Sequence, residues 1–177
     1  GRFLTTDPAG CEASVNLYVY VGNGVVDSVD PEGLQRVHKP KPPRYTFPDH
    51  PADEHCISEG IKKHCKGVKG VSDQQLYAWI WCIIAAKSDW NQDARSNTGA
   101  VGCMQIMPKY WDETCKKLGY SNYQTNACDN IKCGTRILCD CLRKNNGNLH
   151  QCKGLYNTIG NPKFNACMKQ KFPKIPR

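Results

Sequence analysis

The sequence predicts a mainly α-helical domain that is preceded by a short β segment. Two observations lead to this fold class. From residue 72 onward, apolar residues recur at helical spacing between helix start and stop signals. Before residue 35, turn dipeptides bracket alternating aromatic and β-branched residues, which is typical of strands and turns. A chain of 177 residues has room for one such domain and an appendage.

The β segment covers residues 1–34, with turns expected at Asp7-Pro8, Asn23-Gly24 and Asp30-Pro31. It is too short to fold alone, so we expect it to belong to a larger β structure. The chain starts at Gly1 without a signal-peptide pattern, which is what a fragment of a longer polypeptide would show.

Prolines are dense in residues 35–55, above all in Lys39-Pro40-Lys41-Pro42-Pro43. Because proline disfavours both helix interiors and sheet ladders, we expect an extended linker here. The helical domain is then predicted to span residues 56–177.

The first clear helix begins after Ser72, which forms a capping-box pattern with Gln75. Apolar residues follow on one face, and Lys87 ends this stripe. A charge at that position is unusual, because a buried ammonium group is costly unless it is paired. We therefore expect Lys87 to lie where the helix emerges into a cleft.

The stretch after Lys87 has the composition of a cleft lining. Residues 96–102 form a polar loop in which Gly99 and Gly102 allow tight turns and a close approach to a ligand. Residues 104–107 are apolar except for Gln105, whose amide can read a polar ligand. Pro108 is expected to open the next helix.

Two further helices are predicted. One spans residues 111–118 and ends at Gly119, and the other opens at residues 129–131 and stops at Asn145-Asn146-Gly147. The second carries its apolar positions at Ile131, Ile137, Leu138 and Leu142.

Twelve dispersed cysteines favour disulfides and an oxidising compartment. Cys11 lies in the β segment, so eleven remain in the second segment. An odd number leaves at least one thiol free, and Cys82 inside the apolar helix is our candidate. The alternative is a zinc site with ligands drawn from His55, Cys56, His64 and Cys65, or from Cys128 and Cys133, although no CxxC pair occurs.

A formal charge of +8 raises the possibility of nucleic-acid binding, but the basic residues are scattered along the chain. Such a surface would equally suit an anionic cell-wall polymer or an acidic inhibitor. The longest apolar run, residues 78–86, is far shorter than the roughly 20 residues that span a bilayer. We expect neither a nucleic-acid partner nor a membrane span.

The cleft stretch resembles the soluble lytic transglycosylases of the lysozyme-like superfamily. Twelve signature positions match without a gap, namely Ser88, Trp90, Asn91, Ala94, Ser96, Gly99, Ala100, Gly102, Met104, Gln105, Met107 and Pro108. The resemblance covers about residues 72–165 and implies a lysozyme-like fold. Two positions depart: Cys103 replaces a leucine, and Lys87 replaces the family's single catalytic glutamate.

The resemblance also implies a substrate and a mechanism. Relatives cleave the β-1,4 bond between N-acetylmuramic acid and N-acetylglucosamine of peptidoglycan, without water and without a cofactor. One glutamate protonates the leaving oxygen and then draws the proton from the muramic 6-hydroxyl, closing a 1,6-anhydro ring. Lysine is a poor acid at neutral pH and repels the cationic transition state, so this chain should bind but barely turn over.

Further site residues follow from the same resemblance. Leu155-Tyr156-Asn157 stands where relatives have a motif whose tyrosine lies beside the catalytic carboxyl. We therefore expect Tyr156 in the cleft, the alternative being a core tyrosine with a satisfied hydroxyl. The substrate would be held by Ser96, Met104, Gln105 and Asn157.

Residues 1–34 resemble the C-terminal end of the Rhs/YD-repeat core, through GRF…DPAG, NLYVYV and the closing DPEGL. That family encloses a variable toxin in a β shell and is cut after the closing leucine, here Leu34, with aspartates matching Asp7 and Asp30. The resemblance implies a secreted antibacterial effector that acts in the periplasm of a target bacterium. Its partners would be peptidoglycan, the Rhs core shell and a cognate immunity protein.

Two other functions stay open at this point. A non-catalytic sugar-binding module would suit Lys87, and nuclease toxins are common on Rhs carriers. The nuclease hypothesis lacks a visible His/Asp/Glu metal constellation.

Overall fold

A computed structural model describes residues 43–176. Within this range the chain is helical and forms no sheet. Residues 1–42, which include the predicted β segment and the cleavage residues Asp7, Asp30 and Leu34, lie outside the described part. The helices belong to a compact unit that begins at Tyr45.

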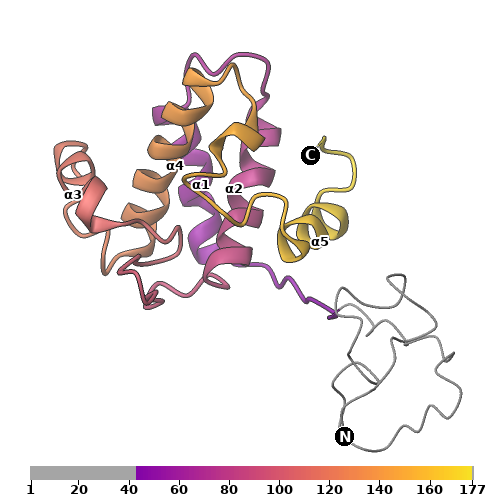
Figure 1. The fold of residues 1–177 in the computed structure, drawn as a ribbon, viewed down its shortest axis with the longest axis horizontal. Helices are drawn as coiled ribbons and strands as arrows, with labels where there is room; N and C mark the ends of the chain where they lie inside the picture. The colour runs from indigo at the N-terminus through magenta and orange to yellow at the C-terminus, as the bar shows by residue number, and fades with distance from the viewer. Residues whose placement is uncertain (1–42, 177) are drawn as a thin grey trace, which may run out of the picture. The chain divides into compact units, whose positions relative to one another are not determined.

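The helices follow in the order α1 (Pro51–His64), α2 (Asp73–Lys87), α3 (Pro108–Lys117), α4 (Ala127–Lys144), the short 3-10 helix η3 (Leu149–Cys152) and α5 (Pro162–Lys171). In Figure 1, α2 lies between α1 and α5, and α1 also packs along α4. None of the described helices combines the length and the apolar character that crossing a membrane requires.

Helix α1 begins earlier than the proline content predicts. Pro51 occupies the first helical turn, where its missing N–H costs nothing, and Asp53 and Glu54 follow in that turn. Residues 51–55 are therefore helical, and the prediction of an extended linker up to residue 55 is wrong there. The prolines mark the start of a helix at this point.

Residues 45–50 are also held against the domain. The Phe47 ring makes an edge contact with Trp81 at 6.3 Å, and the His50 ring stacks on Trp90 at 4.7 Å. Glu54 fixes the turn below them, because its carboxylate accepts hydrogen bonds from the His50 N–H and from Trp81 Nε1. Residues 45–50, which lead into α1, are thus attached by aromatic contacts to Trp81 of α2 and to Trp90.

Helix α2 is the centre of the core. The capping box predicted at Ser72 is present, with Gln75 at the third helical position. The sequence predicts one apolar face, but every residue from Ala78 to Ala85 is buried. Helices α1 and α5 both pack on α2, so more than one face is covered.

Five disulfides join the helices: Cys56–Cys128, Cys65–Cys139, Cys82–Cys167, Cys115–Cys133 and Cys141–Cys152. Among the described cysteines, Cys103 is free, and it is buried. The prediction of disulfides with a leftover thiol is confirmed, whereas the choice of Cys82 is wrong, since α5 brings Cys167 to it. The zinc alternative fails in this oxidised form because all four of its cysteines are in disulfides, Cys56 with Cys128, Cys65 with Cys139 and Cys133 with Cys115.

Two of these bridges set the direction of α1 relative to α4. Cys56 in the second turn of α1 is joined to Cys128 in the first turn of α4, and Cys65 at the C-cap of α1 is joined to Cys139 in the second half of α4. The two helices therefore run parallel. Between the bridges, Gly60 lies against Thr135, where an added Cβ would come within 3.2 Å of the threonine side chain.

The remaining elements follow the predicted signals with small shifts. Pro108 opens α3 as expected. Helix α4 starts two residues before the predicted Asp129, because Asn126 caps it by accepting a hydrogen bond from the Asp129 N–H. Helix α5 was not predicted, although Asn161 and Pro162 form a cap and first-turn signal that could have located it.

Candidate functional site

Lys87 is the last residue of α2, where the helix leaves the core. Its side chain is half-buried, and its Nζ donates a hydrogen bond of 2.6 Å to Asn157 Oδ1. The structure thus brings together two predicted site residues that are 70 positions apart in the sequence. Burial lowers the pKa of the Lys87 ammonium from its ordinary value.

No carboxylate in the described part of the chain forms an ion pair with Lys87. Asp89, two residues on, pairs instead with Lys163 of α5 at 2.7 Å. Glu54 is half-buried, but the donors around it lower the pKa of its carboxyl. Glu54 therefore lacks the raised pKa that a neutral-pH general acid requires.

The chain reverses sharply after Lys87. Asp89 and Trp90 both adopt positive φ angles, of 53° and 63°. Ser88 ties the reversal down, because its Oγ donates to the Cys103 carbonyl at 2.9 Å and also reaches the Ile84 carbonyl. The end of α2 is therefore attached directly to the segment that carries the rest of the signature.

The signature loop, by which we mean the segment between α2 and α3 (residues 88–107), folds as a series of tight turns. Isolated antiparallel bridges pair Val101 with Arg95 and with Ile106. Ser96 closes the loop, since its Oγ accepts from the Ala100 N–H at 2.9 Å. The predicted substrate residue Ser96 thus has a structural task within its own turn.

Gln105 is held in a left-handed conformation, with φ of 51°. Its Nε2 donates to the carbonyls of Ala94 and Gly102, at 3.1 and 3.0 Å. Both amide hydrogens are therefore used inside the loop. The Gln105 side chain is half-buried, and its oxygen is left as the group that can accept from a ligand.

Met104 and Tyr156 lie in the core, which corrects the expectation that they line a cleft. Met104 is fully buried against Gly134 of α4, where an added Cβ would come within 2.6 Å of the methionine Cβ. The Tyr156 hydroxyl donates to the Gly134 carbonyl at 3.2 Å, and burial raises its pKa. Tyr156 is thus a core tyrosine whose hydroxyl is hydrogen-bonded, which is the alternative given in the sequence analysis.

Asn130 is the residue that sequence reasoning missed. It is fully buried on α4 and accepts from the Met104 N–H at 2.7 Å. Its Nδ2 donates to the carbonyls of Val101 and Tyr123, at 3.1 and 2.9 Å. Asn130 therefore holds the signature loop on α4, and an asparagine next to the first apolar residue of that helix was the available signal.

Gly102 makes this contact possible. It has φ of 76°, and an added Cβ would lie 2.2 Å from the Asn130 amide nitrogen. Gln92 supports the same turn, since its Oε1 accepts from the Cys103 N–H and its Nε2 donates to the Tyr123 carbonyl. Gly102 was predicted to permit a close approach to a ligand, and in the structure the group that approaches it is the buried side chain of Asn130.

The resulting site places Lys87 and Asn157 side by side, joined by their hydrogen bond. In the core, Gly134 of α4 contacts Met104 and accepts a hydrogen bond from Tyr156. This arrangement offers ammonium and amide groups to a polar ligand, and no carboxylate of residues 43–176 forms an ion pair with the ammonium.

A comparison with models of protein families matches residues 67–175 to the transglycosylase SLT domain. The match covers more than half of the chain and spans every element from α2 to α5, including Lys87 and Asn157.

Proposed function

This chain belongs to the transglycosylase SLT family, whose members are lytic transglycosylases of peptidoglycan, and from that premise we propose that it binds glycan strands without cleaving them. One observation carries the proposal. The position of the family's acid holds Lys87, which donates to Asn157 and forms no ion pair with a carboxylate of residues 43–176.

The chemistry explains the expected loss of turnover. The family reaction needs one group that first gives a proton to the leaving oxygen and then takes one from the muramic 6-hydroxyl. A lysine ammonium, whose ordinary pKa is about 10.4, is a poor acid at neutral pH, and its charge opposes the oxocarbenium-like centre. Losing a positioned general acid costs about 10² to 10⁴ in rate.

Binding can survive this loss. The signature loop is held by Asn130 and Ser88, both of which act independently of the charge at position 87. Asn157 and the free oxygen of Gln105 offer acceptors for sugar hydroxyls or amides. We propose that these two residues contact the glycan directly, while Ser96, Met104 and Tyr156 position the segments that carry the site.

Restoring the acid tests the proposal. Lys87→Glu should raise the release of soluble fragments from purified peptidoglycan by about 10² or more over the unchanged protein. The fragments should carry 1,6-anhydromuramic ends, which mass spectrometry distinguishes from hydrolysed ends by one water. Lys87→Gln is the matched control, since it removes the charge without supplying an acid.

The possible outcomes separate clearly. Equal activity of Lys87→Gln and Lys87→Glu would contradict a role for the acid. If the Lys87→Glu protein is folded and inactive but still sediments with insoluble peptidoglycan, the domain is a glycan-binding module in which more than the acid has been lost. If the unchanged chain does not sediment with peptidoglycan, the binding proposal is wrong.

The N-terminal residues support a proposal about biological setting. Because residues 1–34 resemble the end of an Rhs core, we propose that the domain is the toxin part of a secreted effector that acts in the target periplasm. Five disulfides suit an extracellular or periplasmic place of action. An Rhs shell and a cognate immunity protein would be its partners.

Cleavage of the longer polypeptide tests this setting. We expect the full-length protein to be cut after Leu34, releasing a domain that begins at Gln35. Intact-mass measurement would show the cut, and Asp7→Asn and Asp30→Asn should prevent it. An uncut parent protein would remove the support for an Rhs origin.

A further inference from the structure

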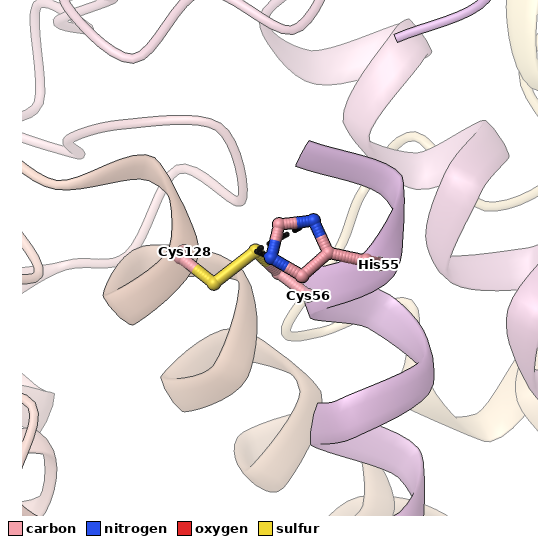
Figure 2. A group of neighbouring side chains, drawn as sticks. All are labelled: His55, Cys56 and Cys128. Atoms are coloured by element: carbon pink, nitrogen blue, oxygen red, sulfur yellow. Dashed lines mark hydrogen bonds between the residues drawn. A yellow bond between two sulfur atoms is a disulfide. The ribbon is translucent and has the colours of Figure 1, made fainter. Parts of the chain in front are cut away.

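A histidine lies against one of the disulfides, away from the glycan site. Figure 2 shows the His55 ring of α1 beside the Cys56–Cys128 bridge, which reaches across to the first turn of α4. His55 Nε2 is 3.4 Å from Cys56 Sγ. One ligating atom from each of the three residues lies within 4.8 Å of the others, a grouping found once in the described part of the chain.

We propose that opening this disulfide creates a site for a divalent cation of the zinc type. Reduction by a phosphine breaks the S–S bond, leaves two thiols and converts the phosphine and one water to the phosphine oxide. Cation binding then releases the two thiol protons. Two thiolates and one imidazole are the soft and borderline ligands that Zn²⁺ prefers, and water completes the tetrahedron.

The bridge is placed where a reductant can reach it. Cys128 is half-buried, as is Cys141 of the Cys141–Cys152 bridge, whereas both cysteines are buried in the bridges Cys65–Cys139, Cys82–Cys167 and Cys115–Cys133. Cys128 also lies in the first turn of α4, where the free backbone N–H groups favour a thiolate.

The helices stay in place when the bridge opens. Cys65–Cys139 still joins the far ends of α1 and α4. Between the two bridges, Lys132 pairs with Glu59 at 2.5 Å, and Gly60 packs on Thr135. The three ligands therefore remain close together, and only a small separation of the sulfurs is needed to admit a metal ion.

Such a site would act in a reducing compartment. Every chain passes through reducing surroundings during synthesis if it is made in a cytosol, and disulfides persist only after export. A metal ion held by His55, Cys56 and Cys128 would link α1 to α4 before oxidation. This inference is independent of the proposed glycan binding, because it uses none of the same residues.

Stepwise reduction of the full chain tests the first half of the proposal. The protein is titrated with a trialkylphosphine, and newly freed thiols are alkylated and located by peptide mass spectrometry. We expect Cys56 and Cys128 to be modified before any buried pair, with the helical circular dichroism retained. Earlier opening of a buried pair, or loss of helix when this bridge opens, would overturn the proposal.

Metal titration of the partly reduced protein tests the second half. One Zn²⁺ should bind, and Co²⁺ should give thiolate charge-transfer and tetrahedral absorption bands. His55→Ala should weaken Zn²⁺ binding ~10-fold or more, since ligand loss costs at least as much as loss of an outer-shell partner. His150→Ala, which removes an exposed histidine of η3, is the matched control. Equal binding by both variants, or none by the unchanged protein, would refute the site.

Discussion

Lys87 Nζ and Asn157 Oδ1 are joined by a hydrogen bond of 2.6 Å between the end of α2 and the turn before α5. We propose above that the first of these positions is the one that carries the acid in the SLT family, and this bond is the contact that its side chain makes instead. The amide oxygen accepts from an ammonium here. A protonated glutamate at position 87 could donate to the same oxygen.

This contact makes a prediction about the Lys87 ammonium. Burial lowers the pKa of Lys87, and the bond to Asn157 favours the charged form and so limits the decrease. Asn157→Ala should therefore lower the pKa further. Nuclear magnetic resonance of ¹³C-dimethylated lysines would follow the titration, with Asn97→Ala, an exposed asparagine, as the control. An unchanged titration midpoint would show that the bond is absent in solution.

The free thiol gives a second prediction. Cys103 is buried, and burial raises its pKa to about 12, so the reactive thiolate is scarce. Alkylation in the folded protein should leave Cys103 unmodified, and alkylation in guanidinium chloride without reductant should modify it. Peptide mapping distinguishes it from the bridged cysteines. Modification at Cys82 in the unfolded, unreduced protein would mean that the Cys82–Cys167 bridge does not form.

Asn130 should contribute much more to stability than its surface counterparts. Asn130→Ala would leave the Met104 N–H and the carbonyls of Val101 and Tyr123 without their partner. Each buried group left unpaired costs about 1–3 kcal/mol, so the free energy of unfolding should fall by roughly 3 kcal/mol or more. Chemical denaturation measures the change.

Asn145→Ala on the same helix is the control for Asn130. Asn145 Nδ2 donates to the Cys141 carbonyl in the last turn of α4, and we expect its loss to cost about 1 kcal/mol. Equal effects of the two substitutions would contradict the role of Asn130 in holding the signature loop.

His64 predicts a loss of stability on mild acidification. The ring is buried and its Nε2 is 2.6 Å from the Tyr120 hydroxyl oxygen. Burial lowers the pKa of His64 from 6.5 to about 4. The unfolded chain therefore binds a proton at a higher pH than the folded chain, so stability falls as the pH drops from 6.5 toward 4.

The size of this effect follows from linkage. Between pH 7.5 and 5.5 the free energy of unfolding should fall by about 1 kcal/mol because of His64. Carboxyl groups such as Asp140, whose pKa is lowered from 3.8, matter only at lower pH. Denaturation of the unchanged protein and of His64→Gln at both pH values measures the difference. If the free energy of unfolding of His64→Gln falls by the same amount over this pH range, a group other than His64 causes the pH dependence.

Local signals in the sequence determined the start and end of several helices. Ser72 and Gln75 fixed the start of α2, and Pro108 fixed the start of α3. A cap or a proline acts on backbone groups within about four residues, so neighbouring residues are enough to predict it. The same holds for the signature from Ser88 to Pro108 and for its departure at Lys87, which are visible in the sequence alone.

Counting also determined that one thiol must remain, because eleven cysteines cannot all pair. The identity of that thiol depended on tertiary structure. Cys82 pairs with Cys167 across 85 positions, whereas Cys103 lies next to the Trp90 backbone with no second sulfur bonded to it. Pairing depends on which helices are neighbours, and helical periodicity does not state this.

Tertiary structure likewise decided the roles of the site residues. Met104 stands in the signature and Tyr156 in the motif Leu155-Tyr156-Asn157, yet both contact Gly134 in the core. Asn130 lies at the predicted start of a helix in the sequence, but in the structure its side chain contacts Gly102 and holds the loop on α4. Burial is a property of contacts between distant segments. The sequence therefore identified the family signature and the lysine that stands before it, whereas the packing of α4 against the signature loop decided which side chains are buried.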